Sequence, residues 1–519
     1  MGISYKNISL LVLLVLAPHS VFCTENNGGR SQDNRLLEHI SEERSAEGKF
    51  TVNSVGGNPS AMFYARTYSI SDFSIRGEFL NRDEAYMVQT GTGHSYGNIE
   101  ANSYMRLTSN TVVWGTAQFE SGTVRDIRWN NSTDFDLVGP YVLADSVGGD
   151  MTSRKYSFSG GYAGESNGWT WGAYISYLAS IDYRNRDPRD KIVVSDLAVK
   201  VGGTRRLFAT YALGIGADLR VYNQESDITF YNPNNEIRTY ALLGLGYYNP
   251  RFSGNTNNST AYSAFGIGAE LNLFDTSRRG GYICMTFHYL PVKQILRNFN
   301  NLELTRSGNY FAGVSMGYKI GINDITCTPQ IIIKTRRQLG YENLYGSAVG
   351  NHYPQIGRRR NYYHDRASAI FDIPLSLPIK KRGRLEFVPG ISMSYDRENY
   401  RKPYRNTCVT LCSPQLSTAA EWRSSTSLLL SIRLFGRHDF VTNKTASLQG
   451  LSEKYLIGTS VLHNFTMLSS AATQYGGRLE ADLVITPTIA LYLGADCNNT
   501  YYPGHGNAIA LGLSAGLKF

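Results

Sequence analysis

Apolar and polar residues alternate along most of this chain, from about residue 64 to its last residue. In the stretch 507–519, Leu511 and Leu513 lie on an apolar face, and small or polar residues occupy the other face. Side chains of an extended strand alternate with a period of two, so the stretch predicts a strand that is apolar on one side. The same alternation recurs at 169–183, 211–221, 265–273, 478–485 and 489–496. The pattern predicts an all-β protein.

Counting these stretches predicts about 16 to 18 strands, within a range of roughly 14 to 18, and a single-chain bacterial barrel should have an even number. The expected strands cover 65–80, 94–108, 111–127, 153–165, 169–185, 191–202, 207–222, 260–274, 280–295, 304–320, 324–339, 366–379, 384–399, 419–435, 438–448, 470–486, 489–500 and 507–519. Residues 236–253 also alternate and could form an extra hairpin. Proline removes a ladder hydrogen bond, so we expect bulges or strand ends at Pro329, Pro374 and Pro389.

The connections between the expected strands fall into two classes. Tight turns are expected at 166–168, 202–204, 321–324 and 436–438, and long polar loops at 130–151, 223–259, 340–363, 400–415 and 449–466. Short turns at one rim and long loops at the other are typical of a transmembrane antiparallel up-and-down β-barrel, and aromatic residues near strand ends suit the two membrane interfaces. A soluble sandwich or propeller would share the alternation, so it remains the alternative fold.

The first 62 residues differ from the rest. Residues 8–18 are apolar but short, which indicates a secretory signal peptide over residues 1–23. Cys23 could instead carry a lipid. We expect a periplasmic segment at 24–62, either mobile or folded back as a plug, and the barrel at 63–519.

Charge and cysteine content exclude several functions. The net charge of +9 is modest for 519 residues, and no basic stripe accompanies a docking motif, so nucleic-acid binding is not expected. Among the six cysteines, Cys408 and Cys412 could form a disulfide in a loop or remain two free thiols. Cys284, Cys327 and Cys497 fall within expected strands. No second cysteine pair supports a zinc site.

Charged residues fall on the polar face of several strands, which faces the lumen in a barrel. They suit either a hydrophilic channel with a charged constriction or a network of paired charges that fills the lumen. No nucleophile–base pair, metal motif or phosphate loop occurs in a suitable context, so neither catalytic residues nor cofactors are expected. The candidate lumen residues are Asp218, Arg220, Glu270, Asn272, Lys334, Arg336, Glu386, Arg433, Arg478, Glu480 and Asp482.

The strand–turn pattern, the segments 182–190 (DYRNRDPRD) and 243–254 (LGLGYYNPRFSG), and the terminal Phe519 together carry a family resemblance. The chain resembles outer-membrane β-barrel proteins of Bacteroidetes-type bacteria, in a family of unknown function. The resemblance implies export to the outer membrane, contact with lipid and lipopolysaccharide, and a barrel-assembly machinery that reads Phe519 as its signal.

Three functions remain open from the sequence. The first is an outer-membrane channel or transporter for small polar solutes. The second is a barrel that transports nothing and docks envelope or secretion proteins through its long loops. The third is a soluble secreted β protein.

Overall fold

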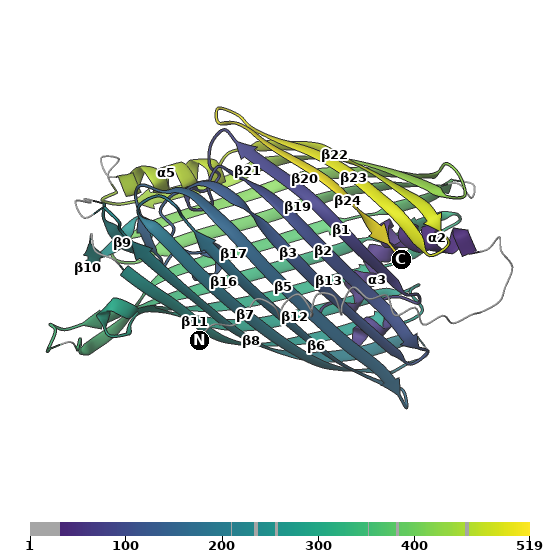
Figure 1. The fold of residues 1–519 in the computed structure, drawn as a ribbon, viewed down its shortest axis with the longest axis horizontal. Helices are drawn as coiled ribbons and strands as arrows, with labels where there is room; N and C mark the ends of the chain where they lie inside the picture. The colour runs from purple at the N-terminus through teal and green to yellow at the C-terminus, as the bar shows by residue number, and fades with distance from the viewer. Residues whose placement is uncertain are drawn as a thin grey trace.

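The chain folds into a closed β-barrel whose strands are inclined to its long axis (Figure 1). The computed structural model describes residues 32–208, 210–232, 237–254, 258–350, 352–379, 383–451 and 456–519. The expected signal peptide and Cys23 lie outside them. The helical elements are α2 (Gln32–Arg44), α3 (Ala46–Val55), α4 (Phe135–Val138) and α5 (Leu456–Leu468), with 3-10 turns η2 (Ala61–Tyr64), η3 (Val88–Thr90) and η4 (Arg297–Phe299).

The first half of the barrel is formed by β1 (Ile70–Arg82), β2 (Gly93–Thr108), β3 (Thr111–Ile127), β5 (Gly149–Ser166), β6 (Trp169–Tyr183), β7 (Arg189–Arg206), β8 (Tyr211–Thr229), β11 (Asn258–Asp275) and β12 (Gly281–Leu296). The second half is formed by β13 (Leu302–Tyr318), β16 (Gln330–Tyr345), β17 (Gln355–Asp372), β19 (Gly383–Tyr400), β20 (Arg405–Arg423), β21 (Leu428–Leu448), β22 (Ala472–Thr486), β23 (Ile489–Tyr502) and β24 (Gly506–Lys518). Three short segments, β14 (Ile320–Ile322), β15 (Ile325–Cys327) and β18 (Leu375–Ile379), extend the wall at one rim.

Each strand pairs antiparallel with its neighbours in sequence, and the described residues form an 18-strand barrel. The last strand closes it, because β24 pairs with β1 from Lys518 opposite Asp72 to Ala508 opposite Arg82. Beyond this ladder, the Phe519 amide donates to the Ser71 carbonyl at 2.8 Å, and the Ser71 amide donates back at 3.1 Å. Closure leaves no sheet edge with unpaired backbone groups, which the apolar core of a bilayer would not tolerate. The predicted fold class is confirmed.

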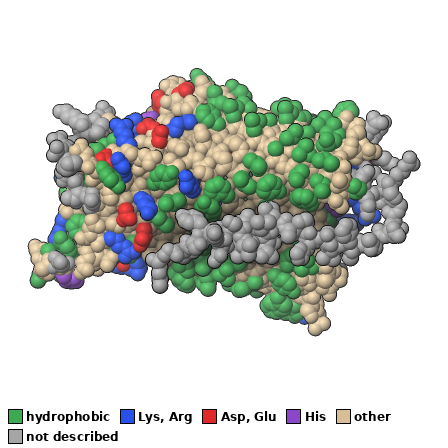
Figure 2. Space-filling model, in the orientation of Figure 1, with side chains coloured by type: hydrophobic (Ala, Val, Ile, Leu, Met, Phe, Trp, Pro, Cys, Tyr) green, Lys and Arg blue, Asp and Glu red, His purple; other side chains and the backbone are tan. Residues whose placement is uncertain are grey.

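The outer surface of the barrel is apolar over most of its height. Leu513, Leu479 and Phe158 point outward and are 69, 57 and 54 % exposed. Figure 2 shows such side chains spread over the visible face, with most of its charged side chains gathered near the end where β9 and β10 lie. An exposed apolar surface of this extent marks contact with lipid. Among the helices of the described segments, none combines the length and the hydropathy that a membrane-crossing helix needs.

The two rims differ, as predicted. At one rim the connections are short, such as Asn167–Gly168 between β5 and β6, where φ angles of 52° and 76° suit a two-residue hairpin turn. The other rim carries a cap, which we define as residues 128–148 with α4 and β4 (Leu143–Asp145), the hairpin of β9 (Thr239–Gly244) and β10 (Tyr247–Gly254), and α5. The hairpin is the extra one predicted at 236–253.

The cap is anchored to the wall by a hydrophobic cluster inside the barrel. Trp129, Val142 and Leu242 of the cap are buried with Ile192 of β7 and Tyr222 of β8. Because these wall residues point inward, the cap fills the lumen at the long-loop rim as well as covering it.

Residues 32–64, here called the plug, lie at the opposite end of the barrel (Figure 1). Phe50 and Val55 of α3 pack with Phe274 and Tyr282 of the wall, and Leu37 and Ile40 of α2 are buried in a separate cluster. The first strand begins only at Ile70. The plug therefore belongs to the folded interior at the short-turn rim.

Two predicted turns, one predicted strand and most of two predicted loops are wrong. The strand predicted at 419–435 spans the end of β20, a turn and the start of β21, and the loop predicted at 340–363 is mostly β16 and β17. Residues 202–204 lie within β7, and 436–438 lie within β21. The turn before β21 lies at 424–427, in a serine-rich stretch without glycine. The predicted loop at 400–415 is mostly β20, which begins at Arg405.

The observed bounds of β20 also exclude the disulfide that the sequence left open between Cys408 and Cys412. Cys408 and Cys412 both lie in β20 and are free thiols. Four residues of extended chain separate Cα atoms by about 13 Å, and a disulfide tolerates no more than about 7 Å. Cys284, Cys327 and Cys497 lie in β12, β15 and β23, as predicted.

The outward face offers a direct test of membrane insertion. Leu513→Arg places a charge on the exposed apolar face near the middle of β24, and should lower the free energy of unfolding in lipid vesicles by about 2–4 kcal/mol. Ser176→Arg, on the inward face of β6, is the matched control and should cost much less. Denaturant titration followed by tryptophan fluorescence measures both. Equal losses for the two variants would contradict a lipid-facing exterior.

Candidate functional site

The plug is seated in a notch of glycines in the barrel wall. Gly172, Gly202 and Gly216 are cross-strand neighbours on β6, β7 and β8, and all three face inward. A Cβ atom on Gly202 would lie 2.0 Å from Oδ1 of Asn58, and one on Gly172 would lie 2.4 Å from the backbone of Pro59 and Ser60. Only glycine allows so close an approach. The stretch 202–204 is strand rather than turn: Gly202 serves this contact, and Gly203 lies against the Trp171 ring on the other face.

Hydrogen bonds fix the same segment in the notch. The Ser60 hydroxyl lies 2.7 Å from the Thr204 hydroxyl, and Asn58 donates to Asn272 Oδ1 at 3.2 Å. The Gly57 amide donates to Glu270 Oε1 at 2.7 Å. These contacts are polar and largely buried, so the plug is bound to the wall by directional hydrogen bonds and not by hydrophobic contact alone.

A cluster of charges holds α2 on the other side of the lumen. Arg44 forms ion pairs with Glu480 and Asp482 of β22, and Lys518 of β24 lies 2.8 Å from Asp482. The Asp482 side chain has no solvent exposure. Removing Arg44 would leave that carboxylate with Lys518 alone, and an uncompensated buried charge is costly.

Two further carboxylates of the plug are paired. Burial alone would raise the pKa of Glu43, but hydrogen bonds and charge from Arg66 outweigh it and hold the pKa below its usual value. Burial likewise opposes ionisation of Glu47, and the bond from Lys319 at 2.7 Å keeps its pKa low. Both carboxylates are therefore docked in their charged forms.

Between plug and cap lies a cavity of about 560 Å³, here called the central chamber. Its inward-facing lining combines apolar side chains, such as Leu290 and Phe311, with charged ones. Arg220 donates to Asp196 at 2.9 and 2.6 Å, and His288 lies 3.0 Å from Asp218. The remaining inward-facing polar lining includes Thr116, Ser157, Ser159, Tyr174, Ser176 and Lys200. The volume is sufficient for a small hydrated solute.

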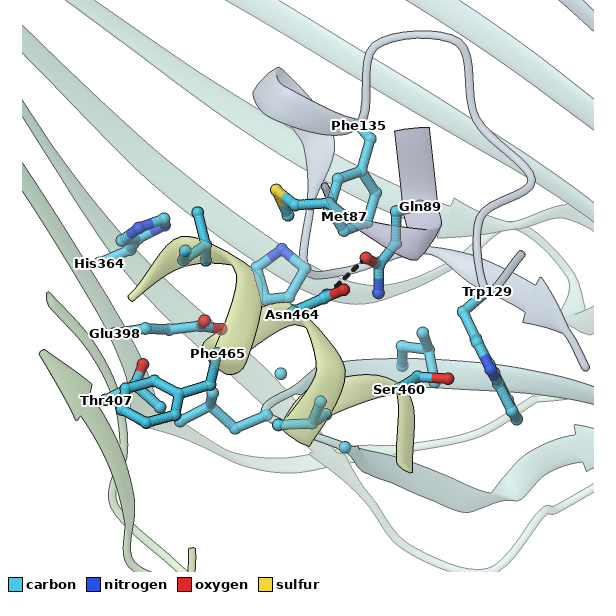
Figure 3. Close-up of a pocket in the computed structure, with 18 of the residues that line it drawn as sticks. Met87, Gln89, Trp129, Phe135, His364, Glu398, Thr407, Ser460, Asn464 and Phe465 are labelled. Atoms are coloured by element: carbon cyan, nitrogen blue, oxygen red, sulfur yellow. Dashed lines mark hydrogen bonds between the residues drawn. The ribbon is translucent and has the colours of Figure 1, made fainter. Parts of the chain in front are cut away.

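A second cavity of about 200 Å³, the loop-end pocket, lies beneath the cap (Figure 3). Phe465 and Ser460 project from α5, and Asn464 of the same helix donates to Gln89 at 2.7 Å. His364 comes from the wall and lies 3.0 Å from Asp396. The pocket thus combines apolar cap residues with ionisable wall residues.

A row of ionisable side chains connects the two cavities. Cross-strand pairing runs from Asp396 through Arg366, Arg336, Phe311, His288, Gly268 and Asp218 to Lys200. Asp396 lies near the long-loop end of β19, and Lys200 lies toward the short-turn end of β7. Because barrel strands tilt by roughly 35–45°, a row that crosses them also descends the lumen. We call it the charge ladder; it leads from the loop-end pocket to the plug.

All eleven predicted lumen residues lie on the inward face, but they belong to different parts of the interior. Glu270 and Asn272 hold the plug tip, and Asp218 and Arg220 line the central chamber. Arg336 lies beside the loop-end pocket and pairs with Asp136 of the cap at 2.9 Å. Three of the others, Arg478, Glu480 and Asp482, lie around Arg44 of the plug. Glu386 and Arg433 contact the junction of α2 and α3. Lys334 lies on the open wall.

Of the two segments that carried the family resemblance, the first holds the cap to the wall and the second forms part of the cap. Arg184, in the first segment, is buried and pairs with Asp145 at 2.9 Å and Asp190 at 3.1 Å. The second segment is the β9–β10 hairpin. Sequence reasoning missed Arg44, Asn58 and the glycine notch, because no local pattern indicates which glycines face a docked segment.

Comparisons with known proteins assign the sequence to a family but identify no substrate. The pattern of one family, described as a family of unknown function (DUF6850), matches residues 59–519. No curated protein sequence matches the chain.

Solved structures with a similar course of the chain include three receptors. The ferric preacinetobactin receptor BauA of Acinetobacter baumannii has a TM-score of 0.36 at 9% identity, over 86% of this chain and 80% of that one. The siderophore receptor PiuA of the same organism has a TM-score of 0.40 at 6% identity, over 86% and 82%. The ferric-catecholate import receptor Fiu of E. coli K12 has a TM-score of 0.37 at 6% identity, over 86% and 81%. Likenesses this low assign no substrate to the chain.

The glycine notch predicts a selective effect of a single methyl group. Gly172→Ala should displace the plug, because the added Cβ meets backbone, and overpacking of this kind costs about 1–3 kcal/mol. Gly436→Ala is the matched control, since a Cβ there has nothing within 4 Å. Trypsin should cleave after Arg44 or Lys49 faster in Gly172→Ala alone. Equal cleavage rates, with both barrels folded, would contradict the docking.

The paired carboxylates predict that acid loosens the plug. Glu43 and Glu47 have pKa values below the reference value of 4.5, so their stabilising contribution is complete above that pH. It is lost as pH falls through their lowered pKa values. A nitroxide at Glu38→Cys, in a background without native cysteines, should become more mobile below about pH 4.5. Glu47→Gln should show higher mobility at pH 7 and a weaker response. Unchanged mobility until the barrel itself unfolds would refute this.

Proposed function

Because this chain belongs to the DUF6850 family of unknown function, its activity has to be inferred from its own interior, and we propose that it is a gated outer-membrane transporter of small polar solutes. In this proposal the plug is the gate. The solute enters at the loop-end pocket and follows the charge ladder through the central chamber.

One observation carries the proposal: a cavity with charged side chains in its wall is kept between two closures. A barrel whose only task was mechanical would gain stability by filling that space with apolar side chains, because empty or wet volume forgoes packing. The charge ladder instead provides polar partners along the descent, as a permeation path requires. The polar seat of the plug supports reversible release, since water can replace its hydrogen bonds.

The cellular setting forms part of the proposal. We place the long-loop rim and cap outside the cell and the plug on the periplasmic side, with the apolar exterior in contact with lipid and lipopolysaccharide. Assembly by a machinery that reads Phe519, and an origin in Bacteroidetes-type bacteria, remain predictions from the sequence. So does the absence of enzymatic activity.

Locking the plug tests the gate. Ser60 and Thr204 have hydroxyls 2.7 Å apart, so the double variant Ser60→Cys/Thr204→Cys, in a background without native cysteines, should form a disulfide on mild oxidation. Solute flux into proteoliposomes should fall to the vesicle background when oxidised and return with reductant. Ser60→Cys alone, treated in the same way, should keep its flux. Undiminished flux through the locked variant would rule out the plug as gate, and absence of flux in the unlocked protein would rule out transport.

A further inference from the structure

The carboxylates and the lysine ammonium groups of the inner wall differ in whether they have a hydrogen-bond or ion-pair partner. Each of the wall carboxylates Asp196, Asp218, Glu270, Asp396 and Asp482 has a hydrogen-bond or ion-pair partner. Among the residues that the structure describes, the ammonium groups of Lys200 and Lys334 have no such partner, although both face the lumen. The ammonium donors of these two lysines are therefore left for a ligand in this part of the lumen.

Lys200 stands at the lower end of the charge ladder, in the wall of the central chamber. At the tip of the plug, an added Cβ on Gly57 would lie 3.2 Å from Lys200 Nζ and 2.9 Å from Glu270 Oε2. The Gly57 amide and Asn272 donate to the other carboxylate oxygen, Glu270 Oε1, at 2.7 Å each, and no ion pair joins Lys200 to Glu270 among the described residues. Lys200 thus retains donors for a ligand in the chamber.

Residues with hydroxyl groups line the same cavity as this ammonium. Ser159 of β5 and Ser176 of β6 line the chamber, as does Tyr174, the direct cross-strand neighbour of Lys200. An ammonium binds an oxyanion as a compact point charge, and serine hydroxyls exchange hydrogen bonds with ligand hydroxyls. The aromatic ring of Tyr174, stacked on Trp114 at 6.5 Å, adds a flat surface of the kind on which a sugar ring can lie.

We propose that the central chamber binds a small hydroxylated oxyanion, of the sugar-acid or sugar-phosphate class, and that Lys200 holds its charged group. The inference rests on the proposed transport function, whose substrate class it specifies. Lys200 would bind the charged group of the ligand, and Ser159 and Ser176 would form hydrogen bonds with its hydroxyl groups. Its charged group would lie next to the plug tip at Gly57.

Calorimetry of the folded full-length protein in detergent tests this directly. The probes are glucuronate, glucose 6-phosphate and glucose. At least one of the two anions should bind more tightly than glucose, and the anion preferred by the wild type identifies the charged group. Lys200→Gln should weaken anion binding about tenfold or more, which corresponds to the loss of one charge-assisted hydrogen bond. Binding of neither anion, or equal binding of glucose, would overturn the proposal.

The matched control lies on the same strand. Lys191 of β7 is exposed on the opposite, outward face, so Lys191→Gln removes an identical charge without touching the chamber. It should leave anion affinity unchanged. A loss as large as that of Lys200→Gln would show a general effect of charge and overturn the role of Lys200. Solute flux without anion binding would refute this inference but not the transport function. Anion binding without solute flux would refute the transport function but not the binding of anions in the central chamber.

Discussion

The width of the barrel is the constraint on which the rest of this structure depends. Closing 18 strands satisfies every backbone group that crosses the membrane, but it leaves a lumen too wide for the wall's own side chains to fill. The chain must either admit water or supply a filling from elsewhere. It does both: residues 32–64 enter from one end, the cap enters from the other, and the central chamber remains between them.

The cap and the plug are held to the barrel wall by different kinds of interaction. The cap is held by a large apolar cluster around Trp129, Val142 and Tyr222, and by the buried pairs of Arg184. The plug has smaller apolar contacts and depends more on its polar seat at Asn58 and on Arg44 against β22. Apolar burial is lost only when surface is exposed to water, whereas polar contacts can be exchanged for water at a modest net cost. The plug is therefore the closure suited to movement.

The sequence predicted what depends on local alternation and missed what depends on long-range contact. The range of strand numbers and the lipid-facing residues such as Leu513 and Leu479 follow from a period of two. Breaks near Pro329 and Pro374 follow from the missing amide, since both lie between strand segments. Both errors in the turns arose where glycine suggested a turn: Gly202 faces Asn58, and Gly436 lies in β21, while serines form the turn at 424–427.

The same limit applies to the interior, where a face can be predicted but a partner cannot. Alternation placed Asp482 and Lys334 in the lumen without indicating that one is buried under Arg44 and that the other has no ion-pair partner among the described residues. That difference matters for ligand binding, because a paired charge stabilises the fold whereas an unpaired one can contact a ligand. Carboxylates on this wall accept hydrogen bonds from arginines, from histidines and from the plug, so alternation alone cannot show which charged groups are still available to a ligand.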